Sequence, residues 1–443
     1  MIPNPEIMQA VERLDYRVTV GDIASQAGLN VTVAQQGLLA LASVAGGHLQ
    51  VAESGEVVYL FPQNFRTVLR NQSLRLQLQE WWSKVWKVLF YLIRISFGIV
   101  LLASIALIVV AILLIVMAAS SSRDDNDRQD SGGGGAIFMP NFWFGPDLFW
   151  IFSPNYDDRI QRSQRLHTRS GEKPKMNFLE AMFSFLFGDG NPNANLEERR
   201  WQAIGTVIRN EQGAVVAEQI APYLDQVGQG FSRPYDDPNE EYMLPVLTRF
   251  NGQPEVSPEG EIVYHFPELQ ATAAQTRSQP VSAYLQEQPW RFSQAGSGQL
   301  ILAVGLGGVN LVGALVLGSL LADGTVAIQL GGLVAFVQSI YWVLLGYGTA
   351  FLALPLLRYF WVQWRNGKIN ARNEARQQQA VQLNQADAKL QVKIAYAQQF
   401  ATETVIGTDN LAYTTERDLL EQDVEQAPKL DAEWERRLDQ GQK

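Results

Sequence analysis

Hydrophobic and polar positions alternate with two different periods through the first 62 residues of the chain. Apolar residues at Ile7, Met8, Val11 and Leu14 follow the i, i+3/i+4, i+7 spacing of an amphipathic helix, whereas residues 49–61 alternate in polarity around Gly55, which is a hairpin signal. The predicted order is helix, short strand, two helices and a hairpin, at residues 6–14, 18–20, 22–27, 32–42 and 49–61. This order is typical of a winged-helix domain.

The same order of elements recurs later in the chain. A first helix, a short strand, a second and a third helix and a hairpin are predicted at residues 201–208, 215–216, 218–224, 242–250 and 254–266. An insertion rich in Gly, Asp and Pro, at residues 228–239, lengthens the turn before the third helix. We therefore expect a second winged-helix-like domain.

An octapeptide repeat links the two modules directly. The segment 55–62 returns 205 positions later as 260–267 with six of eight residues identical, and Val57 is replaced conservatively by Ile262. A repeat at this distance indicates a duplicated module rather than a solenoid. The identical positions, which we expect to be structural, are Gly55, Glu56, Val58, Tyr59, Phe61 and Pro62 in the first copy and Gly260, Glu261, Val263, Tyr264, Phe266 and Pro267 in the second.

Long apolar blocks separate and follow the modules. No charge occurs between Arg94 and Arg123, and about 20 apolar residues suffice to cross the hydrocarbon core of a bilayer. An interfacial aromatic belt precedes this block at Trp81, Trp82, Trp86 and Tyr91. Residues 292–322 and 325–357 are also free of charge and predict a transmembrane helical hairpin joined by Asp323 and Gly324.

The region between the first block and the second module is less regular. Four consecutive glycines and several aspartates predict a flexible linker. The aromatic run 138–152 contains Pro140 and Pro146, which argue against a full helical crossing and favour an interfacial or re-entrant segment. A second aromatic patch, at residues 178–187, is expected to dock on the membrane or under the second module.

The second half of the chain contains two further patterns. Small residues at Ala303, Gly307, Ala314 and Gly318 form a stripe that would let helices approach closely, including helices of a second copy in an oligomer. Residues 368–404 contain no Gly or Pro and predict a long helix leaving the membrane, which either binds a partner or lies against the protein's own domains.

The fold class that we predict is an α+β multi-domain membrane protein with two winged-helix-like domains, transmembrane helices and a long C-terminal helix. Its parts are a first winged-helix-like domain (1–75), a membrane segment (80–119), the linker with its aromatic segment (120–153), a second winged-helix-like domain with a basic and aromatic lead-in (154–285), the hairpin (292–357) and a C-terminal helical region (358–443).

Basic residues flank the first block, open the second module and follow the last block, so all three regions are expected on the cytoplasmic (stromal) side. This arrangement needs an even number of crossings between Lys87 and Arg159. Either the first apolar block folds as a shallow hairpin, or the segment 138–152 completes the return.

Composition excludes several kinds of chemistry. There is no cysteine, so disulfides, thiolate zinc sites and Cys-ligated clusters are excluded, and no P-loop, HExxH or GxSxG motif occurs. The three histidines, His48, His167 and His265, are distant from one another in sequence. We expect no catalytic residue, no metal and no cofactor, and therefore no enzyme.

Charge argues against nucleic acid as a partner. The net charge of −10 repels phosphate backbones and acidic lipid surfaces. The predicted third helix of the first module offers Gln35 and Gln36 but no basic residue, and that of the second is surrounded by carboxylates. DNA recognition needs Lys or Arg at such a helix.

The segments 213–225 and 241–255, the latter running into the second octapeptide, resemble a membrane-protein family of cyanobacteria and chloroplasts. Plant members of that family have carried an iron–sulfur cluster biosynthesis label, but a chain without cysteine cannot ligate a cluster in the usual way. The resemblance implies a thylakoid or other photosynthetic membrane, with the plasma membrane as the other expected location, and it transfers no catalytic residue.

The function that we predict is an integral multi-pass membrane protein whose acidic tandem winged-helix domains dock other membrane or cytoplasmic proteins at the lipid bilayer. Assembly or maintenance of a photosynthetic membrane complex is the most concrete role. The rival hypotheses are a small-solute transporter or channel subunit, which would need a water-lined cavity between the helices, and a membrane-tethered transcription regulator, which would need a basic third helix.

Overall fold

The computed structural model describes residues 4–72, 74–121, 176–225, 240–274, 278–322, 325–385, 387–408 and 411–422, with a few isolated positions beyond. It divides into two compact units. The two-module unit comprises Met1–Glu80, Pro192–Pro289 and Gly367–Lys443, and the helical unit comprises Trp81–Asn191 and Trp290–Asn366. The predicted linker and aromatic segment (120–153) from residue 122 on, the basic lead-in, the insertion 228–239, the Asp323–Gly324 turn and His167 lie outside the described residues.

The first module contains three helices and a three-stranded sheet of its own. Its elements are α1 (Pro5–Arg13), β1 (Arg17–Thr19), α2 (Val20–Ala27), α3 (Val31–Ala45), β2 (His48–Ala52) and β3 (Val57–Leu60), followed by α4 (Phe65–Gln72). Each helix begins at a local cap: the side chain of Asn4 accepts from Glu6 N, Thr19 and Asp22 form a capping box, and Asn30 accepts from Thr32 N. β3 lies between β1 and β2, antiparallel to both.

The second module repeats this order. Its elements are α8 (Leu196–Asn210), β4 (Ala214–Val215), α9 (Ala217–Ile220) with the 3₁₀ turn η2 (Ala221–Tyr223), η4 (Glu241–Met243) with α10 (Leu244–Phe250), β5 (Gln253–Val256) and β6 (Ile262–His265). β6 lies between β4 and β5, as β3 lies between β1 and β2. The short helix α11 (Pro267–Gln270) and the strand β7 (Ala271–Thr272) follow.

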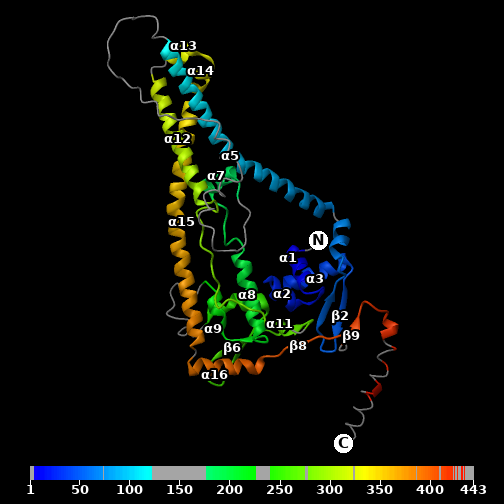
Figure 1. Cartoon of the computed structure of the whole chain (residues 1–443). Coiled ribbons are helices and arrows are strands. Elements are labelled where there is room, and N and C mark those ends of the chain that lie inside the picture. The colour runs from blue at the N-terminus through cyan, green and yellow to red at the C-terminus, as the bar shows by residue number, and fades with distance from the viewer. Residues whose placement is uncertain are drawn as a thin grey trace, which may run out of the picture. The chain divides into compact units, whose positions relative to one another are not determined.

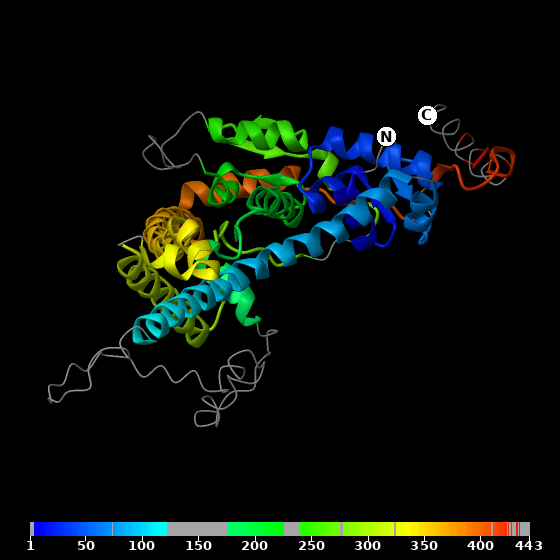
Figure 2. The same ribbon diagram turned by 90° about the horizontal axis from the view of Figure 1, so that it is seen from above.

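The two modules share one hydrophobic core. The cluster of buried side chains runs from Ile7 in α1 to Leu285 after the second module and includes Tyr59, Tyr264 and Phe266. In Figures 1 and 2 the first module is blue, the second green, and they lie side by side. Because they share this core, the two modules pack as one unit rather than as two separate domains.

The C-terminal part of the chain joins both modules. α16 (Ala388–Ala397) begins at the cap Asp387, whose side chain accepts from Leu390 N, and it packs against β6 of the second module. β8 (Thr404–Val405) pairs in parallel with β7, and β9 (Leu411–Thr414) adds to the edge of the first module's sheet by pairing with β2. The sheet order β1-β3-β2-β9 therefore includes a strand from the far end of the chain.

The helical unit contains α5 (Leu74–Ser121) from its residue Trp81, α7 (Phe178–Phe187), α12 (Ser297–Leu321), α13 (Thr325–Leu330), α14 (Gly332–Ser339) and α15 (Tyr341–Asn384) as far as Asn366. Among the described residues, three helices, in α5, α12 and α15, are long and apolar enough to cross a membrane. Their side chains pack together: Ile108 of α5, Leu317 of α12 and Leu344 of α15 belong to one buried cluster.

The small-residue stripe packs within this unit. Ala303 and Ala314 are fully buried, a Cβ at Gly307 would lie 2.7 Å from the Phe351 ring, and one at Gly318 would lie 2.0 Å from the Tyr341 hydroxyl. These contacts account for the stripe without a second copy of the chain. Oligomerisation through it stays a prediction that nothing in this structure tests.

Two helix boundaries differ from those expected. The second arm of the predicted hairpin is not one helix from residue 325: Gly331 and Gly332 take positive φ (59° and 47°), end α13 and start α14, and the long helix begins only at Tyr341. Nor does the helix end near residue 357. It continues to Asn384 with Pro355 inside it, and the predicted helix 368–404 is interrupted between Asn384 and Ala388.

Candidate functional site

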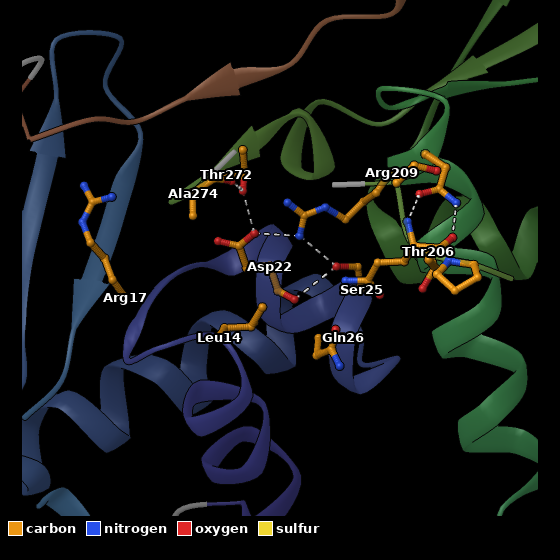
Figure 3. A pocket seen from close by; sticks show the side chains of 13 residues that line it. Leu14, Arg17, Asp22, Ser25, Gln26, Thr206, Arg209, Thr272 and Ala274 are labelled. Atoms are coloured by element: carbon orange, nitrogen blue, oxygen red, sulfur yellow. Dashed lines mark hydrogen bonds and ion pairs between the residues drawn. The ribbon is translucent and has the colours of Figure 1, made fainter. Parts of the chain in front are cut away.

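A cavity of about 360 Å³ opens in the two-module unit where the first and second modules meet. Arg17, Asp22 and Ser25 come from β1 and α2, Thr206 and Arg209 come from α8, and Thr272 comes from β7 (Figure 3). Polar side chains of β1 and α2 therefore line the same cavity as polar side chains that lie about 190 positions (α8) and about 250 positions (β7) further along the sequence. We take this joint, rather than the octapeptides, as the candidate functional site.

Asp22 lies at the centre of the joint. It is the third residue of α2, so its position follows from the capping box with Thr19, whose backbone N–H donates to Oδ2 at 2.8 Å. The carboxylate also accepts hydrogen bonds from the hydroxyl of Thr272 and the backbone N–H of Ala273, both at 3.1 Å. Asp22 is 4% exposed. One local cap residue thus fixes both its own helix and the segment after the second module.

Arg209 completes the joint from the second module. Its Nη1 lies 2.6 Å from Asp22 Oδ1 and donates to Ser25 Oγ at 3.1 Å (Figure 3). Asp22 is buried and Arg209 is largely so, with side-chain exposures of 6% and 11%. A buried ion pair depends on having both partners, because either one alone would be an uncompensated charge in a medium of low dielectric.

Close backbone approach makes this pairing geometrically feasible. A Cβ at Gly205 would lie 2.8 Å from Ser25 Cα, and one at Gly21 would lie 1.9 Å from the carbonyl oxygen of Glu268. Any larger residue at either position would push α2 away from α8 or α11. The two glycines therefore set the distance at which Asp22 and Arg209 meet.

Arg17 ties a third part of the chain to the same region. Its Nε donates to Gln50 Oε1 at 3.0 Å, and its Nη1 donates to the carbonyl oxygens of Ile406 (2.8 Å) and Ala273. Nη2 is buried with no hydrogen-bond partner among the described residues. Burial lowers the pKa of Arg17 below its ordinary value, and the nearby Asp22 carboxylate opposes that shift. The arginine holds the C-terminal segment to the first module.

A second buried charge cluster lies under α16. Lys393 Nζ contacts Glu218 at 2.9 and 3.0 Å and Glu240 at 2.6 Å, and the Tyr264 hydroxyl donates to Glu240 at 2.7 Å. Burial acts to lower the pKa of Lys393, but the two carboxylates outweigh it and the pKa is raised. Burial raises the pKa of Glu240, against the effect of Lys393 and Tyr264. The cluster fastens the C-terminal helix to the second module.

A third group binds the base of α15 to the second module. Arg200 and Arg376 both pair with Asp225, and Arg372 Nε donates to Glu287 at 2.7 Å. Burial opposes ionisation of both carboxyls, but the guanidinium groups outweigh it, so the pKa values of Asp225 and Glu287 lie below their ordinary range. In all three groups, charges on distant segments neutralise one another. Each of these carboxylates faces a cation inside the fold.

The octapeptides lie apart from the joint, in two separate sheets, and form matching hairpins. Gly55 (φ 91°) and Gly260 (φ 83°) occupy the same turn position. Phe61 N donates to Tyr16 O at 2.8 Å, and Phe266 N donates to Gly213 O at the same distance. Tyr59 pairs with Val18 and Leu49, as Tyr264 pairs with Val215 and Pro254. The repeated residues therefore build a turn and a central strand in each module.

Neither of the two histidines that the structure describes lines the cavity. His48 begins β2, and His265 stacks on Phe400 with ring centroids 5.7 Å apart and lies 3.6 Å from Glu255. Sequence reasoning missed Asp22, Arg209 and Lys393 as a group because their partners are 153 or more positions away. The only local signal was the capping position of Asp22 after Thr19.

The comparisons with known proteins place this chain in a family. No family model matches it and no solved structure matches it. An uncharacterized chloroplastic protein of Arabidopsis thaliana is 40% identical over 444 residues, which cover 97% of this chain and 81% of the plant protein. The chain therefore belongs to the family of this plant chloroplast protein.

Proposed function

We propose that this chain is a membrane protein of a photosynthetic membrane whose two-module unit docks protein partners, in the assembly or maintenance of a membrane complex, without chemistry of its own. The three apolar helices of the described residues and the chloroplastic relative are compatible with a membrane-associated plastid protein. The charged groups described above connect segments of the chain to one another, which suits a scaffold.

We further propose that both modules are winged helices. The support is the shared order of helix, strand, two helical segments and hairpin, with the last strand central in each sheet. In the related helix-turn-helix domains the recognition helix is the part that meets the partner, and the third helix has that place here. Here the third elements are α3 and α10.

The observation that carries the docking proposal is the outer face of α3. Its exposed residues carry no charge; they are Thr32, Val33, Gln35, Gln36, Leu39 and Ser43. Val33 and Leu39 are 47% and 45% exposed although both are large and apolar. An apolar patch with amides at its edge fits another protein surface, whereas a phosphate backbone requires Lys or Arg.

The third helix of the second module argues against the transcription-regulator hypothesis. Its one basic residue, Arg249, donates through Nε to the carbonyl oxygen of Gly28 at 2.8 Å, and its guanidinium lies 4.4 Å above the Trp201 ring. Asn30 of the first module also donates to Thr248 O at 3.1 Å. α10 is therefore engaged by the first module, and we propose α3 as the docking helix.

A common side for both modules and the C-terminus is the topology that we propose. Arg94, where the apolar run of α5 begins, pairs with Asp189 at 2.7 Å, and Asp189 accepts from the backbone N–H of Gln294, just before α12. Arg358, where the apolar run of α15 ends, donates to Phe292 O. These contacts bring together one end of each of the three apolar runs, in α5, α12 and α15, at the same end of the helical unit. Along the chain, each of these three ends leads directly to a part of the two-module unit.

Affinity purification tests the docking proposal. Full-length protein carrying Val33→Asp with Leu39→Asp should fold and insert normally but recover its protein partners poorly from solubilised membranes, because two charges would enter an apolar contact. The matched control is Glu53→Asp with Glu259→Asp, which changes two exposed side chains without changing charge. Equal partner recovery from the α3 variant and the control would refute the proposal.

A further inference from the structure

The helical unit has a charge balance opposite to that of the whole chain. Its described residues carry six basic side chains and two acidic ones, whereas the chain has a net charge of −10. The basic residues flank the apolar runs of α5, α12 and α15 at the end where Arg94 meets Asp189; they are Lys84, Lys87, Arg94, Arg291, Arg358 and Arg365. The net charge of the whole chain predicts that it repels acidic lipids. That prediction does not apply to the part of the helical unit that carries these six basic residues.

The segment before α12 is held along α15 by specific hydrogen bonds. The backbone N–H of Trp290 donates to Asn366 Oδ1 at 2.8 Å, and Asn366 Nδ2 donates back to Trp290 O at 2.9 Å. Two turns earlier on α15, Arg358 donates to Phe292 O, with its guanidinium 4.9 Å from the Phe292 ring. The backbone of Trp290, Arg291 and Phe292 is thus hydrogen-bonded to side chains of α15.

Arg365 lies against two indole rings, those of Trp290 and Trp361, which contact each other edge to face with their centroids 5.3 Å apart. Its guanidinium carbon is 4.7 Å from the Trp290 ring centroid and 5.1 Å from that of Trp361. The residue is exposed, and among the ion pairs and hydrogen bonds of the described residues none uses its side chain. Stacking on aromatic faces orients a guanidinium but leaves its in-plane N–H groups available for an anion.

Exposed aromatic residues occur on the same stretch of α15 as this arginine. Trp361 and Trp364 are 41% and 60% exposed, and Arg291 is exposed beside Trp290. Tryptophan concentrates at the level of the lipid headgroups, where its ring contacts acyl chains and its N–H stays near water. Arg365, which lies against two tryptophans, and the exposed Arg291 next to Trp290 in sequence are at the boundary of the apolar helices, so they match an anionic headgroup in charge and in depth.

We propose that Arg365 and Arg291, with Trp290, Trp361 and Trp364, form a binding site for the headgroup of an anionic lipid. The in-plane N–H groups of Arg365 bind the headgroup phosphate or sulfonate, Arg291 adds a second positive charge, and the indoles contact the glycerol and upper acyl chains. A zwitterionic lipid should bind this site less tightly, because its own cationic group competes with the arginines for the phosphate.

Native mass spectrometry of the full-length protein in detergent tests this site. Phosphatidylglycerol and phosphatidylcholine are added separately at equal concentration, and the retained lipid is counted for wild type and for Arg291→Gln with Arg365→Gln. Each arginine near an anionic surface contributes about a fivefold effect, so the double variant should retain phosphatidylglycerol about 25-fold less well. Arg13→Gln with Arg66→Gln, on exposed arginines of the first module, should retain it as wild type does.

Two further arms distinguish a lipid site from simple charge attraction and from a site for free phosphate. Arg365→Lys keeps the charge but loses the planar guanidinium that lies on the indole rings. Its retention of phosphatidylglycerol should therefore lie between that of wild type and that of the double variant. Inorganic phosphate at millimolar concentration should not displace phosphatidylglycerol, because the indole contacts require acyl chains. Equal retention of the two lipids by wild type, undiminished phosphatidylglycerol on the double variant, or displacement by free phosphate would each overturn the proposal.

Discussion

At the scale of single residues, stability depends on buried charges that have partners far away in sequence. Asp22 and Arg209 are the sharpest example, because one capping residue neutralises an arginine from the other module. Asp22→Ala should therefore lower the free energy of unfolding by about 3–5 kcal/mol, since it removes the buried carboxylate that compensates the charge of Arg209.

Thermal unfolding of the full-length protein in detergent measures this loss. Glu12→Ala is the matched control, because it breaks the exposed pair with Arg66 (side-chain exposures 32% and 53%) and should cost no more than about 1 kcal/mol. If the two variants unfold at the same temperature, the joint does not hold the modules together.

The lowered pKa of Asp225 predicts the direction in which the stability of the fold changes with pH. Its pKa lies below the ordinary range because Arg200 and Arg376 outweigh the effect of burial. A carboxyl with a lowered folded-state pKa stabilises the fold above its unfolded pKa of about 3.9 and loses that contribution as the pH falls through the folded value. The melting temperatures of wild type and Asp225→Asn should differ at pH 7 and converge below about pH 4.

Glu53→Gln, at an exposed position of the first module, provides the comparison for that experiment. Its melting temperature should follow wild type across the whole range. A constant gap between wild type and Asp225→Asn from pH 7 to pH 3 would show that the ion pairs do not set the difference.

At the scale of elements, the hairpin strand β3 is buried on both faces. Residues alternate between the two faces of a strand, and the size of Tyr59 and Phe61 predicts that their face is the core and the opposite face is surface. Tyr59 and Phe61 (each 3% exposed) do lie in the shared core. The prediction of a surface face is wrong, because Val58 is fully buried against Ala52, Ala271, Ala273 and Ile406. The covering layer comes from the segments of β7 and β8, which no local pattern near residue 58 could indicate.

This layer gives a prediction for the C-terminal segment. Ile406 is 1% exposed, so Ile406→Ala should cost about 2–5 kcal/mol through the cavity that it leaves. Val405→Ala, at a neighbouring residue that is 38% exposed, should change stability by less than about 0.5 kcal/mol. Chemical denaturation of both variants measures the difference. Equal losses in the free energy of unfolding would mean that the segment around Ile406 does not cover the hydrophobic face of the first module's sheet.

Local periodicity located most elements but not the connections between them. The helices and hairpins of both modules follow from spacing, caps and the repeated octapeptide, since these signals act within a few residues. The break at Gly331 and Gly332 was missed because apolar composition alone does not distinguish one helix from two. β9 and the charged joints were missed because their partners lie in other modules, and only tertiary structure brings them together.

At the scale of the whole molecule, the two modules and the C-terminal segment should face one side of the membrane. Because the chain has no cysteine, single cysteines can be introduced at exposed positions 54, 259 and 416 and labelled with a membrane-impermeant maleimide in oriented vesicles. Ser257 is a poor position because it is 6% exposed. All three sites should label from the same face, and position 54 labelling from the face opposite to position 259 would contradict this topology.

Photo-crosslinking from α3 tests the docking role most directly. A photoreactive amino acid in place of Gln36, on the exposed face beside Val33 and Leu39, should crosslink to a protein in intact photosynthetic membranes, and Val33→Asp with Leu39→Asp should abolish that product. The same probe at Glu198, an exposed residue of α8, should not give it. Crosslinks from position 36 to nucleic acid alone, or a protein crosslink that survives the α3 substitutions, would contradict the role proposed for this protein.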